Sequence, residues 1–208
     1  MTTRRAPALP FLVLPVLASA GCADDAPPRD QLVGTWQDLD DDSGEVIATV
    51  TFADDGLFRS DSAFGGDLFG SWGIYEDQMA LGFAIDDESM MRRMTYGMDG
   101  DVLLAPGMIP DGTVDGLVGL WRSEEETTRS DGSSIVVEIL GLSADGRAVR
   151  RAIENDVLVE TDTGTWREDG NDGWIQLDTT DQAGNQETMR LFALPGEAIG
   201  RDPLTRAD

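Results

Sequence analysis

The sequence predicts an all-β protein made of two tandem antiparallel units, each a β-meander or small barrel. Short runs in which apolar and polar residues alternate recur along the chain, as in Val46–Phe52, and such alternation is typical of half-buried strands. Turn signals such as Asp-Gly separate these runs, in a chain that contains 24 glycines and 9 prolines. The phrase Leu-Val-Gly-x-Trp occurs at residues 32–36 and again at residues 117–121. Its recurrence predicts an internal repeat.

The composition is that of an acidic globular protein without the usual catalytic base. The chain has 208 residues, 40% of them apolar, which is enough for one ordinary domain or two small ones with a packed core. Its 40 acidic and 15 basic residues give a net charge of −25, which repels the phosphates of nucleic acids and anionic lipids. There is no histidine, and no Gly-x-Ser-x-Gly motif marks a nucleophile. We therefore predict no nucleic-acid partner and no enzymatic activity.

The N-terminus predicts export and lipid anchoring. Arg4 and Arg5 precede an apolar stretch that is too short to cross a bilayer, and small residues lead to Cys22, the only cysteine. This arrangement resembles the signal of bacterial lipoproteins, although Ser19 stands where a leucine is common. The resemblance implies that residues 1–21 are removed, that Cys22 is acylated and that residues 22–31 form a tether. It places the protein in the bacterial cell envelope, at the outer membrane, with the membrane as its partner.

The repeated phrase opens two series of matching signals. The matched positions, in chain order, are Gly34 and Trp36 with Gly119 and Trp121, the Asp-Gly turns at 55–56 and 145–146, Gly70 and Trp72 with Gly164 and Trp166, Leu81 with Leu177, and Met94 with Met189. The series predicts a first unit over 32–105, a linker over 106–116, a second unit over 117–194 and a flexible tail over 195–208. Two closed units or one merged barrel of two halves both fit, and the Pro- and Gly-rich linker favours two units.

A Gly-x-Trp opening, a strand ending in Asp-Gly and a second Gly-x-Trp resemble the bacterial lipocalin-like domains. The resemblance implies that Trp36 and Trp121 fill the closed ends of antiparallel barrels. It also implies that an arginine from a late strand stacks on each of these indoles. The arginines available for this role are Arg190 for Trp121 and Arg92 or Arg93 for Trp36.

The interior of the first barrel is the predicted place for a ligand. The apolar residues expected to point inward together are Phe52, Met79, Leu81, Phe83, Met94 and Tyr96. Such an interior is either filled by these side chains or binds a small apolar molecule. The leading hypothesis is a non-enzymatic lipoprotein that binds such a molecule without a cofactor. The alternative is an envelope structural or protein-interaction module that uses its acidic surface.

Two clusters contain residue types that bind metal ions, but neither predicts a metal site. Asp38, Asp40 and Asp42 alternate ahead of Gly44, but the glycine is one place too late for an EF-hand. Methionines gather around residues 90–98, and thioethers suit Cu(I), but no histidine is present to complete a copper site. Core packing is the expected role of these methionines.

Overall fold

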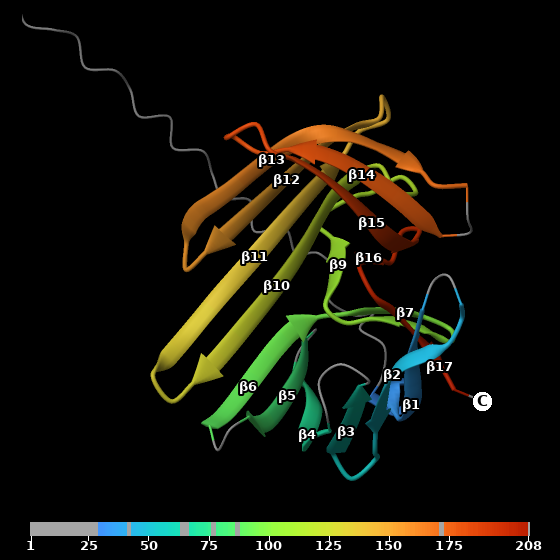
Figure 1. Cartoon of the computed structure of the whole chain (residues 1–208), viewed down its shortest axis with the longest axis vertical. Coiled ribbons are helices and arrows are strands. Elements are labelled where there is room, and N and C mark those ends of the chain that lie inside the picture. Colours follow the sequence, from blue (N-terminus) through green and yellow to red (C-terminus); the bar gives the residue numbers. More distant parts are fainter. Residues whose placement is uncertain are drawn as a thin grey trace, which may run out of the picture.

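A computed structural model describes residues 29–40, 43–62, 67–75, 78–85, 88–170 and 173–207. The predicted signal peptide, most of the tether and Cys22 lie outside these residues. One short helix, α1 (Arg29–Leu32), precedes 17 strands that are all hydrogen-bonded into one sheet (Figure 1). Within the described residues, no helix is long and apolar enough to cross a membrane. The predicted all-β fold class is confirmed.

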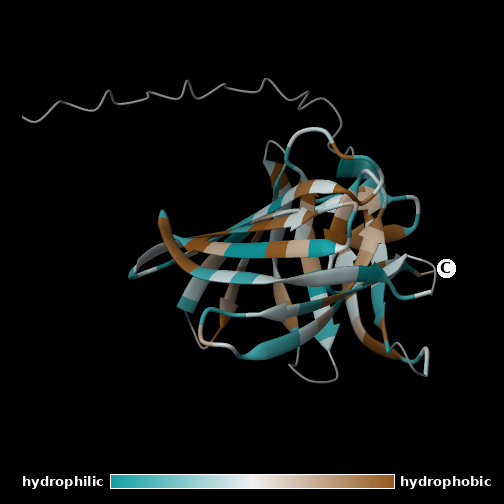
Figure 2. Cartoon of the chain, turned by 90° about the horizontal axis from the view of Figure 1, so that it is seen from above, coloured by the Kyte–Doolittle hydropathy of each residue, from teal (hydrophilic) through white to brown (hydrophobic). Residues whose placement is uncertain are grey.

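The sheet closes into two barrels, which form the lower and upper parts of Figure 1. The first barrel contains β1 (Gly34–Leu39), β2 (Val46–Phe52), β3 (Leu57–Ser62), β4 (Leu68–Tyr75), β5 (Gln78–Ile85), β6 (Glu88–Thr95), β7 (Gly97–Asp99), β8 (Val102–Leu104) and β17 (Pro203–Arg206). The second barrel contains β9 (Gly107–Pro110), β10 (Gly119–Arg129), β11 (Gly132–Leu142), β12 (Arg147–Glu154), β13 (Val157–Glu168), β14 (Trp174–Thr180), β15 (Gln186–Leu194) and β16 (Ala198–Gly200). Apolar and polar residues alternate along the strands, as the interleaved colours of Figure 2 show.

The last strands of the two halves are exchanged between the barrels. β9 follows β8 in the chain, yet it pairs with β16 and β10 and so closes the second barrel. β17 follows β16, yet it pairs with β8 and β1 and closes the first barrel. The predictions of a linker over 106–116 and a flexible tail over 195–208 are therefore wrong. An open barrel would leave unpaired backbone groups at both edges, and these short segments supply the missing partners.

β10 joins the barrels because its two halves have different neighbours. Near its start, Trp121 and Arg122 pair with β9 of the second barrel. Further along, residues 125–128 pair with β6 of the first barrel. Figure 1 shows the β10–β11 hairpin reaching down beside β6. The two predicted units are therefore present as two barrels, and these barrels share one continuous sheet.

The two main tryptophan motifs make the same contacts in both barrels. Trp36 and Trp121 are fully buried, and each indole donates to the carbonyl four residues earlier, of Leu32 at 2.9 Å and of Leu117 at 3.0 Å. Gly34 and Gly119 have φ values of +140° and +152°, which side-chain-bearing residues rarely adopt. Both motifs therefore need glycine at this place.

The second pair of motifs also recurs. Trp72 donates to the carbonyl of Ala53 at 2.8 Å, and Trp166 donates to that of Ser143 at 2.9 Å. A Cβ on Gly70 or Gly164 would lie 2.0 or 1.9 Å from a carbonyl oxygen of the neighbouring strand. Glycine is thus required here by the close approach of two strands.

Strand register corrects one of the matches made from sequence. Met79 pairs with Met94 in the first barrel, and the equivalent Ile175 pairs with Leu191 in the second. Met94 therefore corresponds to Leu191 rather than to Met189. The apolar-polar alternation fits both alignments, because a shift of two residues keeps every side chain on the same face.

The arginine that stacks on Trp36 is Arg206, from the last strand. Its guanidinium lies 4.3 Å from the indole centroid and donates to the carbonyl of Val33 at 3.0 Å. The expected arginines lie elsewhere: Arg190 stacks on Trp174, Arg93 stacks on Tyr75, and Arg92 pairs with Glu125.

Trp121 pairs across the sheet with Pro110, at the position that Arg206 has in the first barrel. A Cβ on Gly119 would meet the Val114 side chain at 2.6 Å, whereas one on Gly34 would meet Arg206 at 2.7 Å. Val114 thus takes the place of the guanidinium in the second barrel. The predicted stacking partners are wrong because the exchanged strands, and not the local meander, lie beside the two tryptophans: β17 brings Arg206 over Trp36, and β9 pairs with Trp121.

Candidate binding groove on the second barrel

The residues predicted to line a ligand cavity form the packed core of the first barrel. Phe52, Met79, Met94 and Tyr96 are each at most 3% exposed and belong to one apolar cluster with Trp36 and Trp72. Leu81 and Phe83 are partly buried and pack against the same cluster. The rings of Phe52 and Trp72 lie 5.0 Å apart, at ordinary contact distance for aromatic rings. The structure therefore brings the six predicted residues together, but as the filling of the barrel.

The interior of the second barrel is apolar at the end closed by Trp121 and ionic further along. Arg150, on β12, points inward and is 13% exposed. It donates to Glu138 on β11 and to Asp162 on β13, and it lies 3.2 Å from Glu160. The Asp162 side chain is 3% exposed, so its charge is almost fully removed from water. The interior of the second barrel therefore carries an ion cluster in addition to its apolar core.

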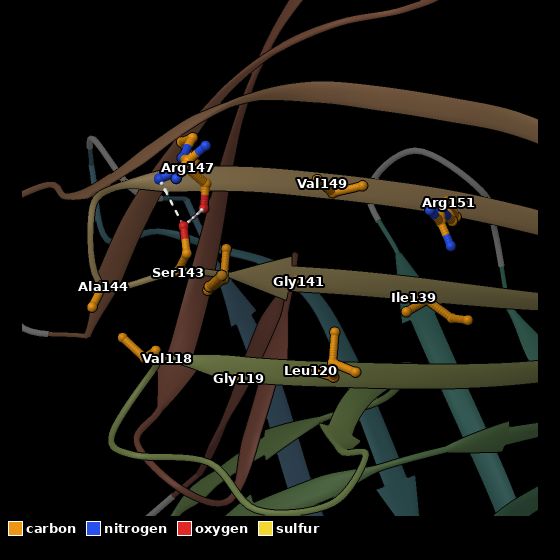
Figure 3. Close-up of a pocket in the computed structure, with 11 residues that line it drawn as sticks. Val118, Gly119, Leu120, Ile139, Gly141, Ser143, Ala144, Arg147, Val149 and Arg151 are labelled. Carbon is orange, nitrogen blue, oxygen red and sulfur yellow. Dashed lines mark hydrogen bonds between the residues drawn. The ribbon is translucent and has the colours of Figure 1, made fainter.

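A groove of about 650 Å³ lies instead on the outer face of β10, β11 and β12 (Figure 3). The alternation that points Trp121, Leu140 and Ala148 inward points their neighbours outward. The walls of the groove are apolar and come from Val118, Leu120, Ile139 and Val149. Leu120 is 49% exposed and Val149 is 37% exposed, although antiparallel sheets usually place polar residues on the face in contact with solvent.

Gly141 forms the floor of the groove. Strand register places it between Leu120 on β10 and Val149 on β12. A Cβ at residue 141 would lie 3.3 Å from the Leu120 side chain, within the hollow. The missing side chain therefore creates the depression, and the φ of Gly141 is not in the left-handed region.

Arg147 and Arg151 line the β12 edge of the groove, on either side of Val149 (Figure 3). Arg147 donates to Asp145 at 2.7 Å. This hydrogen bond, together with one from Ser143, holds the pKa of Asp145 well below its usual range, and the same carboxylate raises the pKa of Arg147. The side chain of Arg151 is exposed and has no ion pair or hydrogen bond to any residue that the structure describes. The groove thus combines an apolar floor with one uncompensated positive charge.

The equivalent face of the first barrel has a different surface. The strand register of the two barrels shows that Leu120 and Gly141 occupy the positions that Thr35 and Thr51 have in the first barrel. The hydroxyls of these two threonines are hydrogen-bonded to each other at 3.1 Å. The same register matches Ile139 with Thr49. These positions point away from both cores, and the same fold forms with polar threonines there. The apolar groove is therefore not a requirement of the barrel.

The aspartates around the β1–β2 turn and the methionines of β6 have structural roles where they are described. Asp40 accepts from the backbone and hydroxyl of Ser43, both at 2.8 Å, and so holds the hairpin turn. On β6, alternation separates the methionines, with Met94 at 3% exposure in the core and Met91 at 36% exposure outside. Within the described part of the chain, no group of three or more acidic, cysteine or histidine residues could hold a metal ion.

A sequence signal for the groove existed in Ile135–Leu142. This run is apolar at nearly every position, a pattern typical of a strand covered on both faces, whereas a half-exposed strand alternates. In the structure one face of β11 lies in the core, and the other face carries Ile139 and Gly141 to the groove.

No model of a known protein family matches the chain, and no match is found among curated proteins or among solved structures.

Proposed function

We propose that this protein is a lipid-anchored, non-enzymatic protein of the bacterial envelope that binds a small apolar ligand in the outer groove of its second barrel. The anchoring rests on the lipoprotein-like N-terminus and Cys22. The binding role rests on one observation, the difference between two equivalent barrel faces. Both faces meet the same demands of folding, so the apolar groove on only one of them needs another reason, and an exposed apolar hollow is a common mark of a binding site.

The dimensions of the groove suit a small molecule. Its volume of about 650 Å³ falls in the ordinary range of ligand pockets. The barrel interiors are weaker candidates, because Trp36 and its neighbours pack the first and the second contains an apolar core and the ion cluster of Arg150. The proposal therefore keeps the small apolar ligand of the sequence-based hypothesis and places it outside the barrel.

A test needs a variant that fills the groove without touching the core. Gly141→Leu places a side chain in the hollow, and Thr51→Leu makes the same side chain at the equivalent place of the first barrel. With the full chain carrying Cys22→Ser, titration of the neutral dye Nile red should show a dissociation constant at least about tenfold weaker for Gly141→Leu, equal to about 1.4 kcal/mol. Thr51→Leu should bind as the parent does. If the dye binds Gly141→Leu as tightly as the parent, the groove is not the site.

An interaction with another protein is the second candidate, and one feature favours it. Val157, Leu158 and Val159 begin β13 directly after the β12–β13 turn and are 61%, 55% and 57% exposed. Three consecutive exposed apolar residues are unusual on a free surface. Replacing all three by threonine, a good strand former, should leave dye binding unchanged and remove any co-purifying protein partner.

A further inference from the structure

The positive charge of Arg151, which has no acidic partner among the described residues, bears on the chemistry of the ligand of the groove. Arg147, Val149 and Arg151 point outward from β12, so alternation puts two arginines on one edge of the groove. Their Cα atoms are about 13 Å apart along the strand. Arg147 is neutralised by Asp145. Across the sheet Arg151 faces Ile139 on β11 and Thr161 on β13, neither of which carries a charge.

The first barrel shows that this arrangement is specific to the groove. Register matches Val149 with Arg59 and Arg151 with Asp61. Arg59 lies 3.0 Å from Asp67 and 3.8 Å from Asp61, so the arginine on that face is compensated. The Arg151 side chain, in contrast, lies beside an apolar hollow and has no acidic partner among the described residues.

We infer that the ligand is a single-chain amphiphile with an anionic head. The inference rests on the proposed binding role of the groove and names the chemistry of its ligand. The apolar tail lies over Gly141 between Leu120 and Val149, and the head, a carboxylate or a phosphate monoester, accepts hydrogen bonds from Arg151. A guanidinium pairs with either oxyanion in a two-bonded geometry.

The net charge of −25 does not oppose this binding at close range. At physiological ionic strength, charges are screened beyond about 8 Å, so the nearest charge dominates the site. That charge is the Arg151 guanidinium. The overall negative charge instead excludes extended anionic surfaces such as nucleic acid, which agrees with the composition.

Competition between ligands of equal tail length tests the inference. Dansyl-labelled undecanoic acid is bound to the full chain carrying Cys22→Ser and displaced by dodecanoate, dodecyl phosphate, dodecanol or dodecyltrimethylammonium. Both anions should bind at least about tenfold more tightly than the alcohol, and the cation should bind most weakly. Arg151→Gln should remove the advantage of the anions and leave the affinity for dodecanol unchanged. Arg59→Gln, on the matched face of the first barrel, should change neither.

The outcomes separate this inference from the proposed function. If dodecanol displaces the probe as well as dodecanoate does, or if Arg151→Gln leaves the anion preference intact, the anionic head is wrong while the groove remains a site for apolar ligands. If only one of the two anions binds more tightly than dodecanol, Arg151 remains the group that binds the head. The result then shows whether the head is a carboxylate or a phosphate monoester. If no competitor or probe binds, both proposals are wrong.

Discussion

Arg150 is the residue that most clearly distinguishes the interior of the second barrel from that of the first. Register places Arg150 opposite Asp162, and the equivalent pair in the first barrel is Ser60 and Leu68. Burial opposes the charged form of Arg150, but the hydrogen bond to Glu138 and the charges of Glu138, Glu160 and Asp162 outweigh it and raise the pKa of Arg150. The arginine therefore stays charged and compensates carboxylates that are partly or wholly buried.

Arg150→Met should destabilise the protein strongly. The substitution removes the only cation in contact with Asp162 among the described residues, and breaking a buried pair in this way typically costs about 3–5 kcal/mol. Urea denaturation measures the loss. Arg167→Met, which breaks an exposed pair with Asp178, is the control and should cost less than about 1 kcal/mol.

A double variant checks the reason for this loss. Arg150→Met combined with Asp162→Leu replaces the most deeply buried pair of the cluster by apolar side chains and should recover part of the stability. Recovery stays incomplete because Glu138 and Glu160, which are more exposed, still lose their partner. Equal effects of Arg150→Met and Arg167→Met, or no recovery in the double variant, would show that the cluster does not act as a buried ionic unit.

Among the elements, β9 and β17 explain how two half-chains become one structure. Each has only four residues, and each completes the barrel of the other half by pairing on both of its edges. β17 also carries Arg206, which covers Trp36. The first barrel therefore depends on the last residues of the chain.

Ending the chain after Asp202 should open the first barrel and spare most of the second. The indole N–H resonances of Trp36 and Trp72 should lose their dispersion in two-dimensional NMR spectra, and those of Trp121 and Trp166 should keep theirs. A chain that ends after Arg206 retains β17 and serves as the control. Unchanged resonances of Trp36 in the shorter chain would contradict the exchange of strands.

Sequence patterns identified most strands but not this exchange. Long alternating runs such as Val46–Phe52 lie on strands as predicted, because alternation is a local property. Gly107–Pro110 and Pro203–Arg206 are short, lie next to prolines and glycines and read as irregular segments. Their strand conformation depends on partners far away in the chain, which no local pattern encodes.

For the whole molecule, the central result is that two barrels with the same tryptophan hydrogen bonds carry different surfaces. The motif glycines and tryptophans were recognisable from sequence because they meet local geometric demands in both halves. The place of the candidate site was not recognisable from sequence. Inward and outward positions alternate along each strand, and the pattern alone does not say which set faces the core. The sequence predicts that Phe52 and Met79 line a cavity, but they fill a core, whereas Leu120, Gly141 and Val149 line the groove.

Mapping a bound ligand on the full chain by methyl NMR tests this account most directly. Titration of the Cys22→Ser chain with dodecanoate should shift the methyl resonances of Leu120, Ile139 and Val149 in a saturable manner, and those of Met79, Leu81 and Leu103 in the first core should remain in place. Saturable shifts of the core methyls without shifts in the groove would contradict the account and return the site to the barrel interior.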